Sequence, residues 1–306
     1  MAILLMVFVI ILYTLQSFFS KLYSDTYPGE EKSSASVFAI VCGVSTTIFS
    51  FCFSGFSYKF SWFTVGMGLI NAAALYLYDY YIIKGSASGP YSILITFSVA
   101  GGIIIPVAFA TAVFNDWLGF VRPIVILLII FAVWLVFDKS DKNRKEKLSS
   151  RFIVSCFGIA IGNGIYGTLL DAQQRVMGPN EREEMVAITF LGCAIFSLIK
   201  LIVQNPKNLK APFIQTGKST VYLIVSAIIS GLAIQVYVVV LPLVDLAVLY
   251  TIDNSSVLFL SFVLSVVVFK EKLTKKNILG CILLCVLLAA MATSDKIETF
   301  ILNCIK

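Results

Sequence analysis

The sequence predicts an all-α polytopic membrane protein in which ten transmembrane helices form two inverted five-helix repeats. Three observations lead to this fold class. First, 59% of the 306 residues are hydrophobic and only 13% are charged, which leaves too few polar side chains to cover a soluble protein of this size. Second, the hydrophobic residues gather into runs of membrane-spanning length. Third, the runs of the two halves follow a similar pattern.

Ten apolar runs are separated by charged residues, by glycine and proline, or by polar clusters. At a rise of about 1.5 Å per residue, a helix of roughly 20 residues crosses about 30 Å of hydrocarbon. The first run has no basic front end and is long for a cleaved signal, so we expect it to be retained as a spanning helix. The runs cover residues 2–20, 36–53, 62–83, 90–113, 119–137, 152–171, 185–203, 219–241, 246–269 and 277–294.

The longest charged segment lies near the middle and predicts the boundary between two repeats. We expect a first five-helix repeat at 1–137, a central basic loop at 138–151 and a second five-helix repeat at 152–306. Phe114–Leu118 and Phe269–Leu273 correspond at an offset of 155 residues, and the same offset aligns the runs around them. Because five is an odd number, the second repeat must be inverted relative to the first. The alternative is a chance similarity between two apolar hairpins.

A family resemblance rests on the end of the ninth run. The stretch Phe269-Lys270-Glu271-Lys272-Leu273-Thr274 is followed by Ile278-Leu279-Gly280 and by an apolar run that ends in small residues. This pattern resembles the closing motif of EamA-like repeats in the drug/metabolite transporter superfamily, whose ten-span layout also agrees. Many relatives carry a proline before the acid, where this chain has Ser256 and, in its first half, Gly101.

The resemblance implies a secondary transporter of small polar or amphipathic metabolites, amino acids or related compounds among them, that often works as an exporter by alternating access. The alternatives are a flippase for a lipid-linked metabolite, a nontransporting membrane receptor or assembly protein, and a membrane enzyme that acts on lipid. The implied partners are a small-molecule substrate and the lipid bilayer, and the implied location is the plasma membrane. The sequence does not predict the oligomeric state.

Enzyme chemistry, metals and cofactors are not expected. The chain has no histidine, which excludes imidazole ligands and a Ser/His/Asp triad. Its seven cysteines lie scattered through mostly apolar runs without a C-x-x-C pair, so we interpret them as small core residues. No phosphate-binding G-x-x-x-x-G-K-[ST] sequence is present, so the driving force must come from a gradient or from a separate subunit.

The basic residues predict an orientation. Of the 23 lysines and arginines, 17 lie in or beside the loops that follow the first, third, fifth, seventh and ninth runs, with Lys200 counted at the end of the seventh. Basic loops stay in the cytoplasm, so we expect the central loop inside and both termini outside. The net charge of +6 is spread over these loops, which favours contact with anionic lipid headgroups over nucleic acid.

Polar side chains on two equivalent helices are candidates for a substrate site. Tyr13 and Gln16 lie one turn apart in the first run, and Asn163 and Tyr166 do so in the sixth. Amide and phenol groups hydrogen-bond a substrate while the aromatic rings contact its apolar part. The alternative is that these groups bind neighbouring helices within the bundle.

The fourth and ninth runs add further candidates. Tyr91 and Ser98 lie on one side of the fourth run with Gly101 and Gly102, for which we expect close helix packing first and substrate clearance second. Asn254 shares a side of the ninth run with other polar residues that lipid would penalise.

Two acids are candidates for coupling transport to protons or for binding a substrate ammonium group. Asp253 lies well inside the ninth run and is the stronger candidate, for substrate binding as well as coupling; Asp79 lies near the end of the third. For Asp79 the alternative is a position at the membrane interface near Lys84, within an aromatic belt.

Overall fold

A computed structural model gives the fold of the chain. It describes residues 2–55, 58–115, 119–136, 149–178, 181–206, 208–240, 243, 246–270 and 274–305. These residues form helices and connecting turns, and no strand occurs among them. The helices are α1 (Ala2–Thr26), α2 (Glu31–Phe53), α3 (Trp62–Ser88), α4 (Tyr91–Phe114), α5 (Val121–Val136), α6 (Ser150–Met177), α7 (Arg182–Gln204), the short η1 (Ala211–Phe213), α8 (Gly217–Val240), α9 (Leu246–Val267), α10 (Lys275–Ala292) and α11 (Ser294–Ile305).

Helices α3, α6 and α10 begin where side chains replace missing backbone partners. The Ser61 and Ser149 hydroxyls accept hydrogen bonds from the backbone N–H of Thr64 and Phe152, the third residue of α3 and of α6. Thr274 and Asn277 form a reciprocal capping box at the start of α10. The Asn277 side chain also donates to the carbonyl of Val136 at the end of α5. The same residues therefore begin one helix and fasten it to another.

The exterior of the bundle is apolar, as a lipid-facing surface requires. Leu127, Trp134, Val203 and Phe259 are each at least 57% exposed. Six of the described helices, namely α1, α2, α4, α6, α7 and α8, have the length and hydropathy of a membrane span, and α10 with α11 would make a seventh if that bent pair is one span. The chain is thus a multi-pass integral membrane protein. Our prediction of ten spans is consistent with this result and is not established by it.

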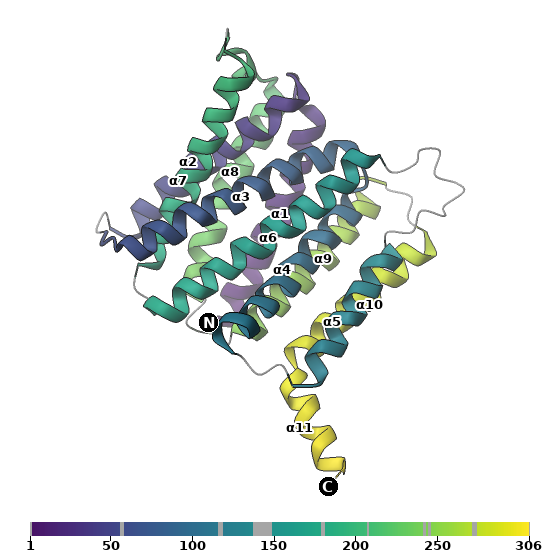
Figure 1. Ribbon diagram of the computed structural model, residues 1–306. Coiled ribbons are helices and arrows are strands. Elements are labelled where there is room, and N and C mark those ends of the chain that lie inside the picture. Colours follow the sequence, from purple (N-terminus) through teal and green to yellow (C-terminus); the bar gives the residue numbers. More distant parts are fainter. Residues whose placement is uncertain are drawn as a thin grey trace.

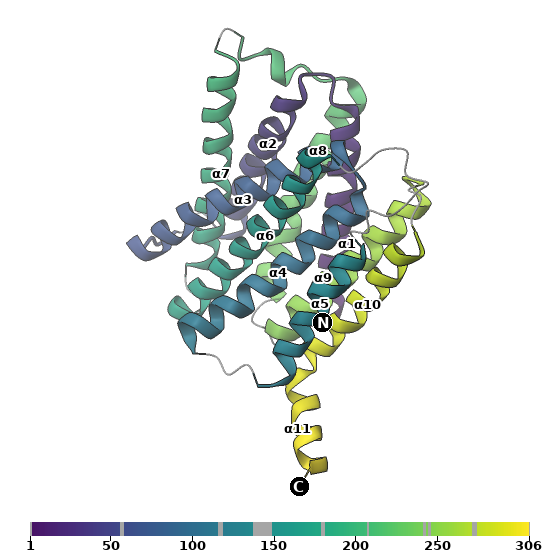
Figure 2. The same cartoon turned by 45° about the vertical axis from the view of Figure 1, so that its right-hand side comes forward.

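The helices pack as one bundle with a lateral pair (Figures 1 and 2). The larger body contains α1–α4 and α6–α9, whereas α5 and α10 lie against each other at its side and contact it mainly through α9. Within the body α3 packs against α6 and α7, and α8 packs against α1 and α2. The two chain ends lie toward the same end of the molecule (Figure 1).

Glycines allow close helix packing at the centre of the body. A Cβ atom on Gly101 of α4 would lie 2.1 Å from the backbone oxygen of Ala160 in α6, and one on Gly164 of α6 would lie 2.5 Å from the carbonyl oxygen of Gly101. A Cβ on Gly162 of α6 would lie 2.7 Å from the backbone nitrogen of Tyr78 in α3. The prediction of close packing therefore holds for Gly101, and these contacts fix α6 between α3 and α4.

Helix α11 was not among the predicted runs. It follows α10 after a bend of 76° and is tied to the start of α5, because Arg122 donates to the Ser294 hydroxyl and the Phe120 N–H donates to Glu298. Helix α11 therefore runs in a different direction from α10.

Candidate functional site

The larger body encloses a cavity of about 130 Å³. A single ordered water needs roughly 10–15 Å³ of such space, so the cavity has room for several waters or one small organic molecule. Eight helices contribute to its wall. The lining residues are Tyr13, Gln16, Cys42, Leu75, Tyr78, Asp79, Gly102, Asn163, Tyr166, Gly167, Leu170, Phe190, Ser230, Ile234, Tyr237 and Asn254.

The cavity lies near the middle of the membrane-spanning helices. Leu75 is at the centre of α3, Asn163 is at the centre of α6, and Gly102 is at the centre of α4. A point halfway along helices of spanning length is close to the bilayer midplane. Polar groups at this depth must face protein or a hydrated space, and the cavity supplies that space.

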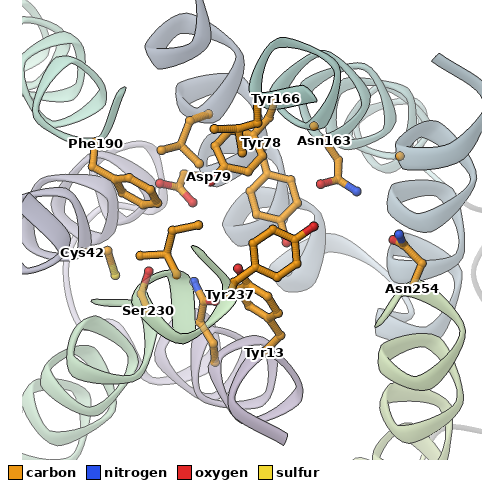
Figure 3. A pocket seen from close by; sticks show the side chains of 16 residues that line it. Tyr13, Cys42, Tyr78, Asp79, Asn163, Tyr166, Phe190, Ser230, Tyr237 and Asn254 are labelled. Carbon is orange, nitrogen blue, oxygen red and sulfur yellow. The ribbon is translucent and has the colours of Figure 1, made fainter. Parts of the chain in front are cut away.

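Aromatic side chains form much of the wall (Figure 3). The rings of Tyr13 and Tyr237 meet edge to face with centroids 6.0 Å apart, and those of Tyr166 and Phe190 do so at 6.5 Å. Tyr78 lies beside Tyr166 in the same view. These rings come from five different helices, so the central part of the cavity is apolar on its ring faces and polar only at the phenol groups.

Two amides meet at one end of the cavity, where Asn163 and Asn254 point toward each other (Figure 3). Asn163 donates to the Ser98 carbonyl at 2.9 Å, which fixes its orientation. Gly102 leaves room for both side chains: a Cβ there would lie 2.7 Å from Asn163 Nδ2 and 3.6 Å from Asn254 Oδ1. Because Pro106 has no N–H, the Gly102 carbonyl also lacks the usual i+4 donor.

Asp79 lies at the other end, beside Cys42 and Phe190 (Figure 3). Only 5% of the residue is exposed. Its carboxylate accepts a weak hydrogen bond from Cys193 Sγ at 3.7 Å, and Cys42 lines the same end of the cavity. No salt bridge joins Asp79 to a lysine or arginine of the described residues. The cavity therefore has an acidic end and an amide end, with tyrosines between them.

Comparison with known proteins identifies the family. Residues 150–293 match the family model described as "EamA-like transporter family". The matched residues form α6–α10, so the second half of the chain matches the EamA-like transporter family. This family lies in the drug/metabolite transporter superfamily, as the motif after the ninth run predicts, and the match implies a membrane transporter of small molecules.

Solved structures share the fold of this chain. Nineteen chains match it, and one of them, a crystal structure of a protein, aligns with a TM-score of 0.65 over 95% of this chain and 96% of its own at 16% sequence identity. At that identity the likeness shows a common fold alone. A comparison with curated proteins found no match.

The cavity gathers most of the candidate residues. Those that line it are Tyr13, Gln16, Asp79, Asn163, Tyr166 and Asn254. Tyr91 and Ser98 do not: Tyr91 is fully buried against Phe269, with ring centroids 5.5 Å apart, and Ser98 acts through its carbonyl on Asn163. The side chain of Asp253 lies outside the described part of the structure.

Helix α8 contributes Ser230, Ile234 and Tyr237 to the wall, and none of these residues was among the predicted candidates. The internal repeat of the sequence could have indicated these residues. The offset of 155 that relates the two halves places Leu75 on Ser230 and Asp79 on Ile234, and all four line the cavity. Applying the repeat to the third run would have indicated the matching part of the eighth.

No group of three His, Cys, Asp or Glu side chains suited to a metal occurs among the residues that the structure describes. The polar groups of the cavity wall are amides, phenols, hydroxyls, one thiol and one carboxylate. Such a wall is suited to reversible binding of an organic molecule.

Proposed function

We propose that this protein is a secondary carrier of small polar or amphipathic metabolites that works by alternating access. The observation that supports the proposal most is the mid-membrane cavity, which every helix of the larger body lines with at least one residue. Substrate sites of carriers built from inverted repeats are expected at this depth, where the repeats meet.

Helix contacts support ten spans in two inverted repeats. If α1–α5 correspond to α6–α10, the contact of α3 with α6 should recur between α8 and α1, and that of α3 with α7 between α8 and α2. Both recur. Helices α2, α4 and α5 also meet their own counterparts, α7, α9 and α10. A pseudo-twofold axis in the membrane plane would produce these pairings, because it exchanges the halves while leaving the cavity in place.

The lining residues have distinct proposed roles. Gln16, Asn163 and Asn254 would hydrogen-bond the polar part of a substrate, and Tyr13 and Tyr166 would contact its apolar part. For coupling to a gradient, Asp79 is the candidate within the cavity and Asp253 is a second candidate from sequence alone. A carboxyl group in a membrane interior is stable when it holds a proton or faces a cation, and exchange of one for the other couples two fluxes.

Aromatic side chains pack together at the end of the bundle where α1 and α9 finish. Phe269 packs against Phe18 at 5.7 Å and against Tyr91 at 5.5 Å between ring centroids, and the Lys21 ammonium group lies 5.9 Å from its centroid. Alternating access requires one side to be closed while the other is open. We assign Tyr91 to this closure.

Metabolite profiling tests the proposal. Cells that overproduce the wild-type chain should differ from cells that lack it in the distribution of at least one small metabolite between cells and medium. The double variant Asn163→Ala/Asn254→Ala should abolish that difference, because it removes the amide end. The matched control is Asn303→Ala, since Asn303 is exposed on α11. Unchanged distributions for the wild type across a broad metabolite panel would contradict the carrier function.

A groove on the outer surface favours a second candidate function. Its volume is about 420 Å³, and it runs between α1, α9 and α10, lined by Val7, Ile10, Ile11, Ser256, Phe259, Leu260 and Cys285. An apolar groove open to lipid is what a flippase for a lipid-linked metabolite needs. Phe259→Trp, which fills the groove, should then stop translocation of a fluorescent short-chain lipid in liposomes. A soluble-metabolite carrier would tolerate this change.

A further inference from the structure

We propose that the cavity selects organic monocations, namely amines with one positive charge and an aromatic or branched apolar body. The inference rests on the proposed function, because it takes the cavity to be the transport site. It concerns the substrate class, which the family match leaves open.

The charge of the wall is the first argument. Asp79 is the single acidic residue among the described lining residues, and these residues include no lysine or arginine. Its carboxylate has a thiol as hydrogen-bond donor, and thiols donate weakly. An ionised carboxylate in such a place is destabilised unless a cation faces it. The acidic end therefore favours a ligand that brings its own positive charge.

The described lining residues carry negative charge in one half of the chain only. The position in α8 that corresponds to Asp79 is Ile234, and both residues line the cavity. The two halves thus enclose a cavity to which the described residues contribute an acid from the first half only. One carboxylate matches one positive charge, placed at one end of the ligand.

The tyrosines provide the second argument. Tyr13, Tyr78 and Tyr237 lie between the acidic and amide ends (Figure 3). Ring faces attract an organic ammonium group and also cover apolar surface. A hydrated metal ion gains little here, because such ions require several oxygen ligands arranged around them.

The amide end provides the third argument. Asn163 and Asn254 are neutral, and Asn163 already donates one hydrogen bond to the Ser98 carbonyl. A ligand carboxylate at this end would meet no described cation. Hydroxyl, ether or carbonyl groups suit the amides better, so we expect simple amines to bind more tightly than amino acids with the same side chain.

Binding measurements on the purified full-length protein test the inference. The probes are 2-phenylethylamine, the uncharged 2-phenylethanol, the anionic 3-phenylpropionate and the zwitterion L-phenylalanine, each titrated calorimetrically in detergent at pH 7. We expect the amine to bind most tightly. Asp79→Asn should weaken amine binding at least about tenfold, because it removes a buried charge partner, and should leave binding of the alcohol unchanged.

Two further variants separate binding from folding. Asp25→Asn removes a carboxylate that is 42% exposed, pairs with Lys21 at 2.8 Å and lies outside the set of cavity-lining residues, so this variant should bind the amine as the wild type does. Tyr237→Leu should weaken amine binding while Asp79 is intact. Thermal unfolding and gel filtration of each variant show whether the fold is retained.

Equal binding of amine and alcohol, insensitive to Asp79→Asn, would overturn the inference, and so would tighter binding of 3-phenylpropionate or no binding of the amine. None of these results would contradict a carrier of neutral or anionic metabolites. The carrier proposal fails separately, in the metabolite profiling, if wild-type cells show no change in any compound.

Discussion

At the scale of single residues, Glu181 joins the starts of two helices. Its Oε2 atom accepts hydrogen bonds from the backbone N–H of Ser61 at 2.9 Å and from the Ser61 hydroxyl oxygen at 2.6 Å. The same hydroxyl accepts from the Thr64 N–H and caps α3. These hydrogen bonds lower the pKa of the Glu181 carboxyl below its ordinary value of 4.5. The ionised carboxylate therefore positions the start of α3 against the start of α7.

The lowered pKa predicts a pH-dependent contribution to stability. Because the pKa is lower in the folded state than in the unfolded state, the contribution is fully present above pH 4.5 and is lost as the pH falls through the folded-state value. Thermal unfolding of the wild type and of Glu181→Gln, measured between pH 7 and about pH 3.5, should give Tm values that differ at neutral pH and converge in acid. A difference that stays constant over this range would contradict the assignment.

Residue spacing predicted part of the candidate site. Tyr13, Gln16, Asn163 and Tyr166 were found because helical periodicity places each pair on one face, and both faces line the cavity. Periodicity could not do the same for Ser98. Helix α4 is buried on all sides through its first eleven residues, so a polar stripe there does not show which neighbour it faces.

Asp79 shows a different limit of the sequence. A third run that ended near residue 83 would place Asp79 close to the membrane interface, but α3 continues to Ser88. Asp79 therefore lies inside the helix and is buried. The Lys84 ammonium group, offered as its interfacial neighbour, donates to the Tyr80 phenol oxygen instead. Hydropathy could not indicate that α3 continues to Ser88. A helix extends beyond its apolar stretch wherever the polar side chains of its last turns find hydrogen-bond partners.

At the scale of helices, each of the ten predicted runs corresponds to one of the helices α1–α10, and the differences lie at the helix ends. Helices α1, α3 and α6 extend five to six residues beyond the runs, to Thr26, Ser88 and Met177. Helix α11 was missed because its amphipathic sequence has no apolar run of spanning length. Hydropathy thus predicts which segments are helices, and local side-chain partners decide where each one stops.

The contact between α4 and α6 gives a prediction at this scale. Gly101→Ala would place a methyl group against the backbone of Ala160, which cannot rotate away as a side chain can. We expect α4 and α6 to separate and the free energy of unfolding to fall by about 1–3 kcal/mol. Gly66→Ala is the control, because a Cβ at this exposed position in α3 meets nothing within 4 Å. Thermal unfolding in detergent would contradict the prediction if both variants were equally stable.

At the scale of the whole molecule, the proposed symmetry and the charges have separate roles. The repeat would create a cavity of similar shape from both halves and allow the halves to exchange conformations. The charges break the equivalence: among the described lining residues the acid lies in one half, and the basic loops follow the odd-numbered helices. Sequence predicts this loop asymmetry directly. It could not predict the cavity, because the wall depends on contacts between residues distant in the chain, such as those of α3 with α7 and of α8 with α1.

Two exposed cysteines test the topology and the orientation together. Cys52 is in the last turn of α2, and Cys304 lies beyond α10 in α11. With ten spans, both follow an even number of crossings and must lie on the same side of the membrane. The basic loops predict that this side is the outside.

In intact cells, variants that retain only Cys52 or only Cys304 should both react with a membrane-impermeant maleimide. Reaction of both only after permeabilisation would reverse the orientation and leave ten spans intact. Reaction from opposite sides would contradict the span count itself, and with it the inverted repeat on which alternating access depends.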